Sequence, residues 1–282
     1  MPGLSFRIVN VFAGSRLAGN PLCVFEDGSS LDAETMQAIA LQFNLSETTF
    51  ILRPQSAAAT AQVRIFTPTF EMPFAGHPTL GTAHVVRDLH RTGDAVKLEM
   101  KAGIIPVAAR GDVWTLQANA PVWHAPELAR EQLAQMLSIE ASDVKEGSLW
   151  VDTGSEQLIV PLASAAAVDR CQPDAELLAR YSVGAKRQGL VYVWARLDER
   201  RLRVRFFFTK FGAVIEDPGT GSACANLGGW FIATGAPLPL EFGLEQGDIV
   251  GRPCRLSLRV DAQKRIHVSG RVIEIARGKL DV

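Results

Sequence analysis

The chain contains two similar segments at a fixed spacing. Glu71-Met72-Pro73-Phe74-Ala75-Gly76-His77 and Glu216-Asp217-Pro218-Gly219-Thr220-Gly221-Ser222 share Glu, Pro and Gly at positions 145 residues apart, about half of the 282-residue chain. Each segment follows an aromatic and β-branched run that begins with Arg, Arg64-Ile65-Phe66 and Arg205-Phe206-Phe207. A repeat of this length predicts two copies of one structural unit. Because clefts at domain interfaces are preferred ligand sites, we expect one active site between two similar domains.

The segments that follow the two motifs read as unusual helices. Residues 78–89 (PTLGTAHVVRDL) and 223–234 (ACANLGGWFIAT) carry small or apolar residues on nearly every face, which is typical of a buried helix. Gly81, Gly228 and Gly229 each lower helix propensity by about 1 kcal/mol relative to Ala. That cost is reasonable if a surrounding sheet approaches the helix axis closely. We therefore predict an α+β protein with two β-barrels, each curled around a central helix.

Strands dominate the rest of the chain. Besides the central helices, periodicity predicts helices over 32–43, 127–137 and near 175–181, and the helix over 127–137 is expected to open the second half. Arg201, Arg203 and Arg205 alternate with apolar residues, which predicts a half-buried strand with a solvated basic face. The predicted strands are 6–12, 21–25, 48–52, 62–66, 96–100, 104–108, 113–118, 157–162, 191–195, 202–208, 255–260, 266–268 and 272–275.

Composition narrows the class of protein. The formal net charge of −1 argues against a dedicated nucleic-acid binder, which normally has a strong basic excess. Residues 1–7 lack a basic and apolar secretory pattern, and the sequence has no apolar run of about 18 residues that could span a membrane. Cys23, Cys171, Cys224 and Cys254 lack metal-ligand spacing and read as reduced, buried thiols. We expect a cytoplasmic protein that interacts with neither nucleic acid nor membrane.

The starts of the central helices are the first candidates for chemistry. Pro78 suits the first position of a helix, so we predict His77 as the N-cap residue and Ser222, at the same place in the second repeat, as its counterpart. The glycines before them, Gly76 and Gly221 among them, would let backbone N–H groups face outward. A helix N-terminus of this kind attracts anions, which predicts a small substrate with a carboxylate.

Each feature also has a plainer interpretation. The segment from Gly219 to Cys224 matches neither the phosphate loop, nor the dinucleotide fingerprint, nor the nucleophile elbow, and alone it is a capped helix start. His77 and His84 share a helix face, which more often reflects packing than a metal site. Glu47, between a helix end and a strand, is either a solvated carboxylate or a partly buried one, and burial would raise its pKa toward the range of a general acid–base.

A series of ordered motifs runs from about residue 5 to the C-terminus. The motifs are Asn10-Val11-Phe12, 19–25 (GNPLCVF), 44–48 (NLSET), Phe66-Thr67-Pro68, 71–79 (EMPFAGHPT), 217–223 (DPGTGSA), Glu245-Gln246-Gly247 and Gly251-Arg252-Pro253. Together they resemble the PhzF-like phenazine biosynthesis isomerase family. The resemblance implies the diaminopimelate epimerase-like fold, with an N-terminal barrel over 1–118 completed by about 270–282 and a C-terminal barrel over 119–269. It also implies an isomerase without metal or other cofactor, commonly a homodimer.

The resemblance also assigns roles to residues. It implies that Glu47 is the proton-shuttling acid and base, that His77 and Asp217 are polar catalytic residues, and that a further set binds substrate: Ser46, Gly76, Gly221 and Ser222. Related amino-acid epimerases and racemases place a thiol before each central-helix glycine, where this chain has Ala75 and Thr220, so stereoinversion by two thiols is excluded.

We therefore predict an isomerase that moves a proton on a small cyclic carboxylate, similar to trans-2,3-dihydro-3-hydroxyanthranilate, by Glu47 acid–base catalysis in the inter-domain cleft. Two alternatives remain open. One is a one-base racemase, epimerase or lyase acting at the same site, and the other is a ligand-binding protein without turnover. The loop 153–157 (TGSEQ) varies where family members often differ, which leaves the choice of substrate open.

Overall fold

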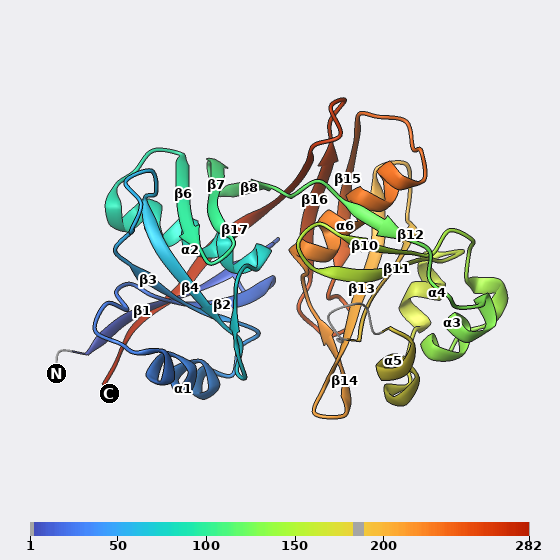
Figure 1. Cartoon of the computed structure of the whole chain (residues 1–282), viewed down its shortest axis with the longest axis horizontal. Helices are drawn as coiled ribbons and strands as arrows, with labels where there is room; N and C mark the ends of the chain where they lie inside the picture. Colours follow the sequence, from blue (N-terminus) through green and yellow to red (C-terminus); the bar gives the residue numbers. More distant parts are fainter. Residues whose placement is uncertain (1–2, 183–188, 282) are drawn as a thin grey trace. The chain divides into compact units, whose positions relative to one another are not determined.

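The computed structural model describes residues 3–182 and 189–281. Residues 1–2 and 282, which belong to the first predicted domain, lie outside the described residues. The chain divides into two compact units, residues 1–117 with 269–282 and residues 118–268. Within each unit, β-strands surround one helix, α2 or α6 (Figure 1). This is the predicted α+β architecture of two barrels with central helices.

The first unit is a closed barrel. Its strands follow the order β1-β2-β3-β4-β6-β7-β8-β17, and β17 pairs again with β1. The pairs β2–β3 and β4–β6 are parallel, while the short β5 pairs antiparallel with β4. The bounds are β1 Leu4–Val11, β2 Asn20–Phe25, β3 Thr48–Leu52, β4 Ala61–Phe66, β5 Glu71–Met72, β6 Ala95–Met100, β7 Gly103–Arg110, β8 Val113–Gln117 and β17 Ile266–Leu280.

The second unit repeats this order of elements. Its strands pair as β9-β10-β11-β12-β13-β15-β16, with β14 antiparallel to β13. The parallel pairs β11–β12 and β13–β15 fall where β2–β3 and β4–β6 fall in the first unit. The bounds are β9 Val122–His124, β10 Leu149–Asp152, β11 Glu156–Pro161, β12 Leu190–Arg196, β13 Arg201–Lys210, β14 Ala213–Asp217, β15 Leu240–Gln246 and β16 Cys254–Val260.

The central helices are α2 (Gly76–His90) and α6 (Gly221–Ala233). A Cβ atom added at Gly81 would lie 2.6 Å from Leu22 Cδ2, and one at Gly228 would lie 2.8 Å from Ile266 Cγ2. Real Cβ atoms do not approach other atoms so closely, so the strands pack against the bare backbone. The expected reason for the costly helix glycines is confirmed.

The remaining helices lie outside the barrels. Helix α1 (Ala33–Phe43) is capped by Asp32, whose side chain accepts from the Thr35 N–H, and it ends at Asn44 in a left-handed conformation. In the second unit the outer helices are α3 (Arg130–Leu137), α4 (Ala165–Arg170), α5 (Ala175–Tyr181) and a 3-10 turn at Ala141–Asp143. Helix α3 starts three residues later than predicted and does not open the second half, because the short strand β9 precedes it.

The helix starts differ from the sequence-based prediction. The N-cap residues are Ala75 and Thr220, and neither His77 nor Ser222 caps its helix. The first intrahelical N–H donors in the two helices are Thr79, which bonds the Ala75 carbonyl, and Cys224, which bonds the Thr220 carbonyl. Pro78 precedes the first donor, so its missing N–H costs no helix hydrogen bond. His77 and Ser222 are therefore the second residues of their helices.

Both units contain the same ion pair before the central helix. Arg64 donates to both carboxylate oxygens of Glu71, each at 2.8 Å, and Arg205 donates to those of Glu216 at 3.1 and 2.7 Å. Each guanidinium also lies over the phenylalanine two residues further along its strand, at 5.0 and 4.6 Å. The sequence repeat thus corresponds to a repeated structural contact that fixes the hairpin leading into each helix.

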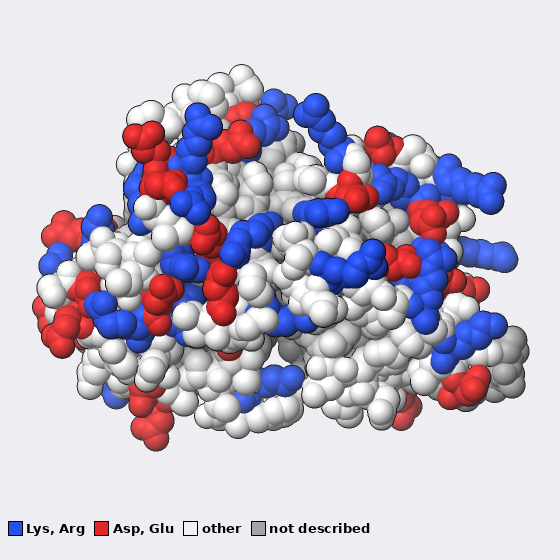
Figure 2. Space-filling view, turned by 180° about the vertical axis from the view of Figure 1, so that it is seen from behind, with Lys and Arg blue, Asp and Glu red and all other residues white. Residues whose placement is uncertain are grey.

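The expected basic face on β13 is not a solvated stripe of positive charge. Arg205 is only 6% exposed, and it also donates to the Val168, Asp169 and Cys171 carbonyls at 3.1, 3.2 and 2.7 Å. Arg203 pairs with Asp248 at 2.9 Å. On the face shown in Figure 2, basic and acidic side chains are interspersed and do not form a patch of one sign. A guanidinium that already has carboxylate partners is poorly suited to binding phosphates.

Two further findings concern the described residues as a whole. None of their helices is long and apolar enough to cross a membrane. Within 3–182 and 189–281, no group of three or more His, Cys, Asp or Glu side chains is arranged to hold a metal ion.

Candidate functional site

Glu47 and His77 come together in the first unit. Glu47 lies between the end of α1 and the first residue of β3, and its side chain is 15% exposed. Its Oε2 atom is 3.3 Å from Nδ1 of His77, the second residue of α2. This is a close polar contact, and catalytic hydrogen bonds often tighten only when a substrate is bound. The sequence indicated both residues separately, and the fold brings them into contact.

The imidazole of His77 is buried, which favours its neutral form. Its side chain is 6% exposed, and burial lowers its pKa to about 3, although a hydrogen bond with the Pro21 backbone opposes this shift. A neutral imidazole has one N–H donor and one acceptor nitrogen. His77 can therefore exchange a hydrogen bond with Glu47 without forming a permanent ion pair that would hold the carboxylate in its ionised form.

The two predicted binding residues near this pair differ in exposure. Ser46 is exposed beside Glu47, whereas Gly76 is buried as the first residue of α2. The N–H groups of Gly76 and His77 precede the first intrahelical donor, Thr79. A positive helix end therefore lies beside the Glu47 carboxylate.

The predicted residues of the second unit gather at the start of α6. Asp217 is the last residue of β14, and its Oδ2 atom accepts a hydrogen bond from Thr220 Oγ at 2.5 Å. Gly221 and Ser222 are the first two residues of the helix, and their N–H groups precede its first intrahelical donor, Cys224. The second unit thus offers a carboxylate, a hydroxyl and a positive helix end.

Gln246 holds this helix start in place. Its Nε2 atom donates to the Asp217 carbonyl and to Thr220 Oγ, each at 2.9 Å, and its Oε1 atom accepts from the Thr220 N–H at 3.2 Å. The next residue, Gly247, has φ +79°, and a Cβ there would lie 2.5 Å from the Pro218 carbonyl oxygen. The segment Gln246-Gly247 therefore holds the loop after Asp217 in place. It is part of a family motif to which the sequence assigned no role.

Ser222 has a buried partner on the neighbouring strand. Gln157 of β11, 2% exposed, donates from Nε2 to Ser222 Oγ at 3.0 Å. Sequence reasoning assigned no role to Gln157, Asn226 or Gln246. Asn226 could have been found, because a polar residue inside an otherwise apolar buried helix must have hydrogen-bond partners.

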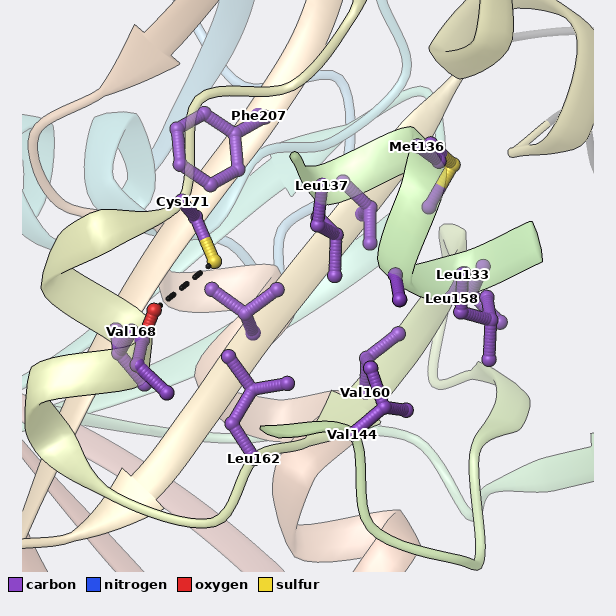
Figure 3. Packing of buried hydrophobic residues seen from close by; sticks show 14 of the residues in the cluster. Leu133, Met136, Leu137, Val144, Leu158, Val160, Leu162, Val168, Cys171 and Phe207 are labelled. Carbon is purple, nitrogen blue, oxygen red and sulfur yellow. Dashed lines mark hydrogen bonds between the residues drawn. The ribbon is translucent and has the colours of Figure 1, made fainter. Parts of the chain in front are cut away.

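The cysteines lie in the interiors of the two units. All four are free and buried. Cys171 lies among the apolar side chains of the second unit, close to Val168, Leu162 and Phe207, and donates to the Ala167 carbonyl at 3.3 Å (Figure 3). Burial raises its pKa to about 12, and burial also raises the pKa of Cys224. Thiols of this kind are poor nucleophiles and bases at neutral pH.

Known proteins resemble the chain over its full length. An uncharacterized isomerase of Pasteurella multocida is 39% identical over 99% of this chain and 94% of its own. A trans-2,3-dihydro-3-hydroxyanthranilate isomerase of Pseudomonas chlororaphis is 35% identical over 98% of both chains. The crystal structure of a PhzF-family phenazine biosynthesis protein from Bacillus anthracis superposes with a TM-score of 0.86 at 24% identity and covers 100% of both chains, which confirms the fold.

A family model described as phenazine biosynthesis-like protein matches residues 9–278. That match includes both central helices and all of the candidate site residues described in this subsection. The chain therefore belongs to the PhzC/PhzF family of phenazine biosynthesis-like proteins.

Proposed function

We propose that the protein is an isomerase that moves a proton within a small carboxylate-bearing metabolite, with Glu47 as the acid and base and with no cofactor. The observation that carries this proposal is the contact between the Glu47 carboxylate and the neutral His77 imidazole at 3.3 Å. A carboxylate that serves as general acid and base must both accept and return a proton near neutral pH. Partial burial, with a neutral rather than a cationic neighbour, favours that behaviour.

The reaction is balanced without an external reagent. Glu47 removes a proton from a carbon atom that neighbouring unsaturation makes acidic, and the electron pair of the broken C–H bond enters the conjugated system. The protonated Glu47 then delivers the proton to another carbon of the same molecule. Substrate and product have the same composition, and no electrons are transferred to or from the protein.

We infer the substrate class from the residues at the start of α6, Asp217 and Ser222. We assign the substrate carboxylate to the first turn of α6, where the Ser222 hydroxyl and the free N–H groups favour an anion. Asp217 is assigned to an amine or hydroxyl of the same substrate, because an ionised carboxylate only accepts hydrogen bonds. The Pseudomonas chlororaphis relative is named for a cyclic amino carboxylate, and a molecule of that class, similar to trans-2,3-dihydro-3-hydroxyanthranilate, is the proposed substrate.

Incubation in D2O tests the reaction type. The purified protein is mixed with trans-2,3-dihydro-3-hydroxyanthranilate and with a panel of small unsaturated carboxylates, and NMR follows carbon-bound deuterium and double-bond position. We expect a product isomer with deuterium at the new C–H position or with the original proton returned. Stereoinversion at one carbon would instead identify a racemase or epimerase, elimination would identify a lyase, and binding without any exchange would identify a ligand-binding protein.

The homodimer implied by the family resemblance and the cytoplasmic location expected from composition stay predictions. Light scattering coupled to gel filtration tests the first, and fractionation of the producing cells tests the second.

A further inference from the structure

A chain of buried hydrogen bonds in the second unit ends at Ser222. It joins Thr153, Gln157 and Asn226, whose exposed fractions are 6%, 2% and 0%. Asn226 lies one helical turn after Ser222 in α6. All of the groups belong to residues 118–268, so the network is internal to one unit.

The orientation of the Asn226 amide is fixed by the backbone. Its Oδ1 atom accepts from the Thr153 N–H at 2.9 Å, and also from Thr153 Oγ at 2.7 Å. Its Nδ2 atom donates to the Ser155 carbonyl at 2.7 Å. A backbone N–H can only donate and a carbonyl can only accept, so the amide cannot be turned over without losing two hydrogen bonds.

The orientation of the Gln157 amide is fixed by Asn226. The second hydrogen of Asn226 Nδ2 goes to Gln157 Oε1 at 2.9 Å, so the oxygen of the Gln157 amide must face Asn226. The Gln157 Nε2 atom then faces Ser222 Oγ, at 3.0 Å. Because an amide nitrogen only donates, the Ser222 oxygen must accept this hydrogen bond, and its own hydrogen is left to point elsewhere.

We propose that Asn226 and Gln157 are positioning residues that hold the Ser222 hydroxyl as a hydrogen-bond donor toward the substrate. The group that receives the Ser222 hydrogen is then an acceptor, a carboxylate or carbonyl oxygen. This inference rests on the proposed function, since it assumes that Ser222 contacts the substrate, and it adds which atoms set the preference.

The network is not a requirement of the barrel fold. Gly81 stands 145 residues before Asn226, at the corresponding position of α2, and has no side chain. The first unit forms the same barrel around its helix without any amide at this position. The polar chain is therefore an addition specific to the half that contains Ser222.

Binding measurements on a double-mutant cycle test the inference without requiring turnover. The probe is anthranilate, an aromatic amino carboxylate, and aniline, which lacks the carboxylate, is the ligand control. Isothermal titration calorimetry compares wild type, Gln157→Met, Ser222→Ala and the double variant. The exposed Gln135 on α3 provides the matched control, Gln135→Met.

We expect Gln157→Met to weaken anthranilate binding by about 3- to 10-fold, the worth of an ordinary hydrogen bond. Ser222→Ala should weaken it by about 10-fold or more, since the ligand is charged. The double variant should bind as Ser222→Ala does, because Gln157 acts only through that hydroxyl. Aniline binding should be the same in all of the variants. Fully additive losses, or an unchanged Gln157→Met, would overturn the inference.

A second variant covers the case in which Gln157→Met does not fold. In Gln157→Glu the new carboxylate accepts the Ser222 hydrogen and so removes the donor. With neutral 2-aminobenzamide as probe, charge repulsion contributes little, and weaker binding is expected. Unchanged binding would contradict the proposed polarity. The D2O experiment judges the isomerase proposal separately, so a protein that exchanges deuterium but shows additive binding losses keeps its function and loses this inference.

Discussion

The Nδ1 atom of His77 and the Oε2 atom of Glu47 lie 3.3 Å apart, although the two residues belong to different elements, the start of α2 and the loop before β3. Neither residue is fully exposed, and burial lowers the pKa of the imidazole, which favours its neutral form. A carboxylate with such a neighbour accepts a proton without first breaking a strong ion pair. This relationship leads to the first two predictions.

The first prediction concerns the proton carrier. Glu47→Gln keeps the size and the hydrogen-bonding capacity of the side chain but removes its ability to take up a proton. We expect kcat to fall by about 10²- to 10⁴-fold, as is usual on loss of a general acid–base, while anthranilate affinity changes little. The exposed Glu34 on α1 supplies the control Glu34→Gln, which should keep full activity. Retention of more than half of the turnover by Glu47→Gln would rule out the assignment.

The second prediction concerns stability in acid. The folded-state pKa of His77 is about 3, below the value of about 6.5 expected in the unfolded chain. Between these values the unfolded state binds more protons, so the free energy of unfolding should fall as the pH is lowered from about 6.5, by up to about 1.4 kcal/mol per pH unit from this group. Urea titrations at several pH values give the free energy of unfolding of wild type and His77→Gln. This free energy should depend less steeply on pH in the variant. The same pH dependence of the free energy of unfolding in both proteins would contradict this prediction. His90→Gln, at an exposed position, is the control.

The third prediction concerns the thiols. Changing Cys23, Cys171, Cys224 and Cys254 to Ala should leave kcat unchanged, because burial keeps them protonated and the positions before the helix glycines are Ala75 and Thr220. Stability should fall through lost packing. Turnover and denaturation are measured on the same preparations. Inactivation of the wild type in proportion to modification of one cysteine, without unfolding, would show that the carboxylate mechanism is wrong.

The fourth prediction compares the two repeated ion pairs. Arg205 and Glu216 have side chains that are each 8% exposed, whereas the Arg64 side chain is 24% exposed. Removing one partner of a buried pair costs about 3–5 kcal/mol because the other charge stays buried, so Arg205→Met should destabilise the protein by about that much. Arg64→Met should cost clearly less. Chemical denaturation measures both, and a larger loss for Arg64→Met would contradict the argument.

The repeat was sufficient to predict the architecture because each copy carries its own burial signal. A helix that is apolar on every face, with glycines facing the sheet, must be buried, and the inside of a barrel is such a site. The strand 240–246 was missed although Leu240, Phe242 and Leu244 alternate, since Gly243 and the intervening glutamates lower strand propensity. The strands predicted over 266–268 and 272–275 are parts of one long strand, β17, because Gly270 is accommodated against Phe12 without ending it.

The residues of the candidate site were proposed from sequence motifs, whereas their contacts could be described only from the fold. Motifs identified Glu47, His77, Asp217 and Ser222, but no local pattern shows that an amide on β11 orients a hydroxyl on α6. The predicted N-cap residues lie two positions after the observed ones because the prediction put Pro78 at the first helical position. Any helix position before the first N–H donor accepts proline. That the groups of the two units act on one substrate in an inter-domain cleft stays a prediction.

The long strand β17 has a consequence for how the chain is made. Its first residues belong to the second unit, and from Ser269 onward it fills the gap between β1 and β8 in the first. During synthesis the amino-terminal barrel therefore leaves the ribosome without one of its strands, and the edges of β1 and β8 are unpaired. It can close only after the carboxy-terminal half has emerged, so the part made first is the part completed last.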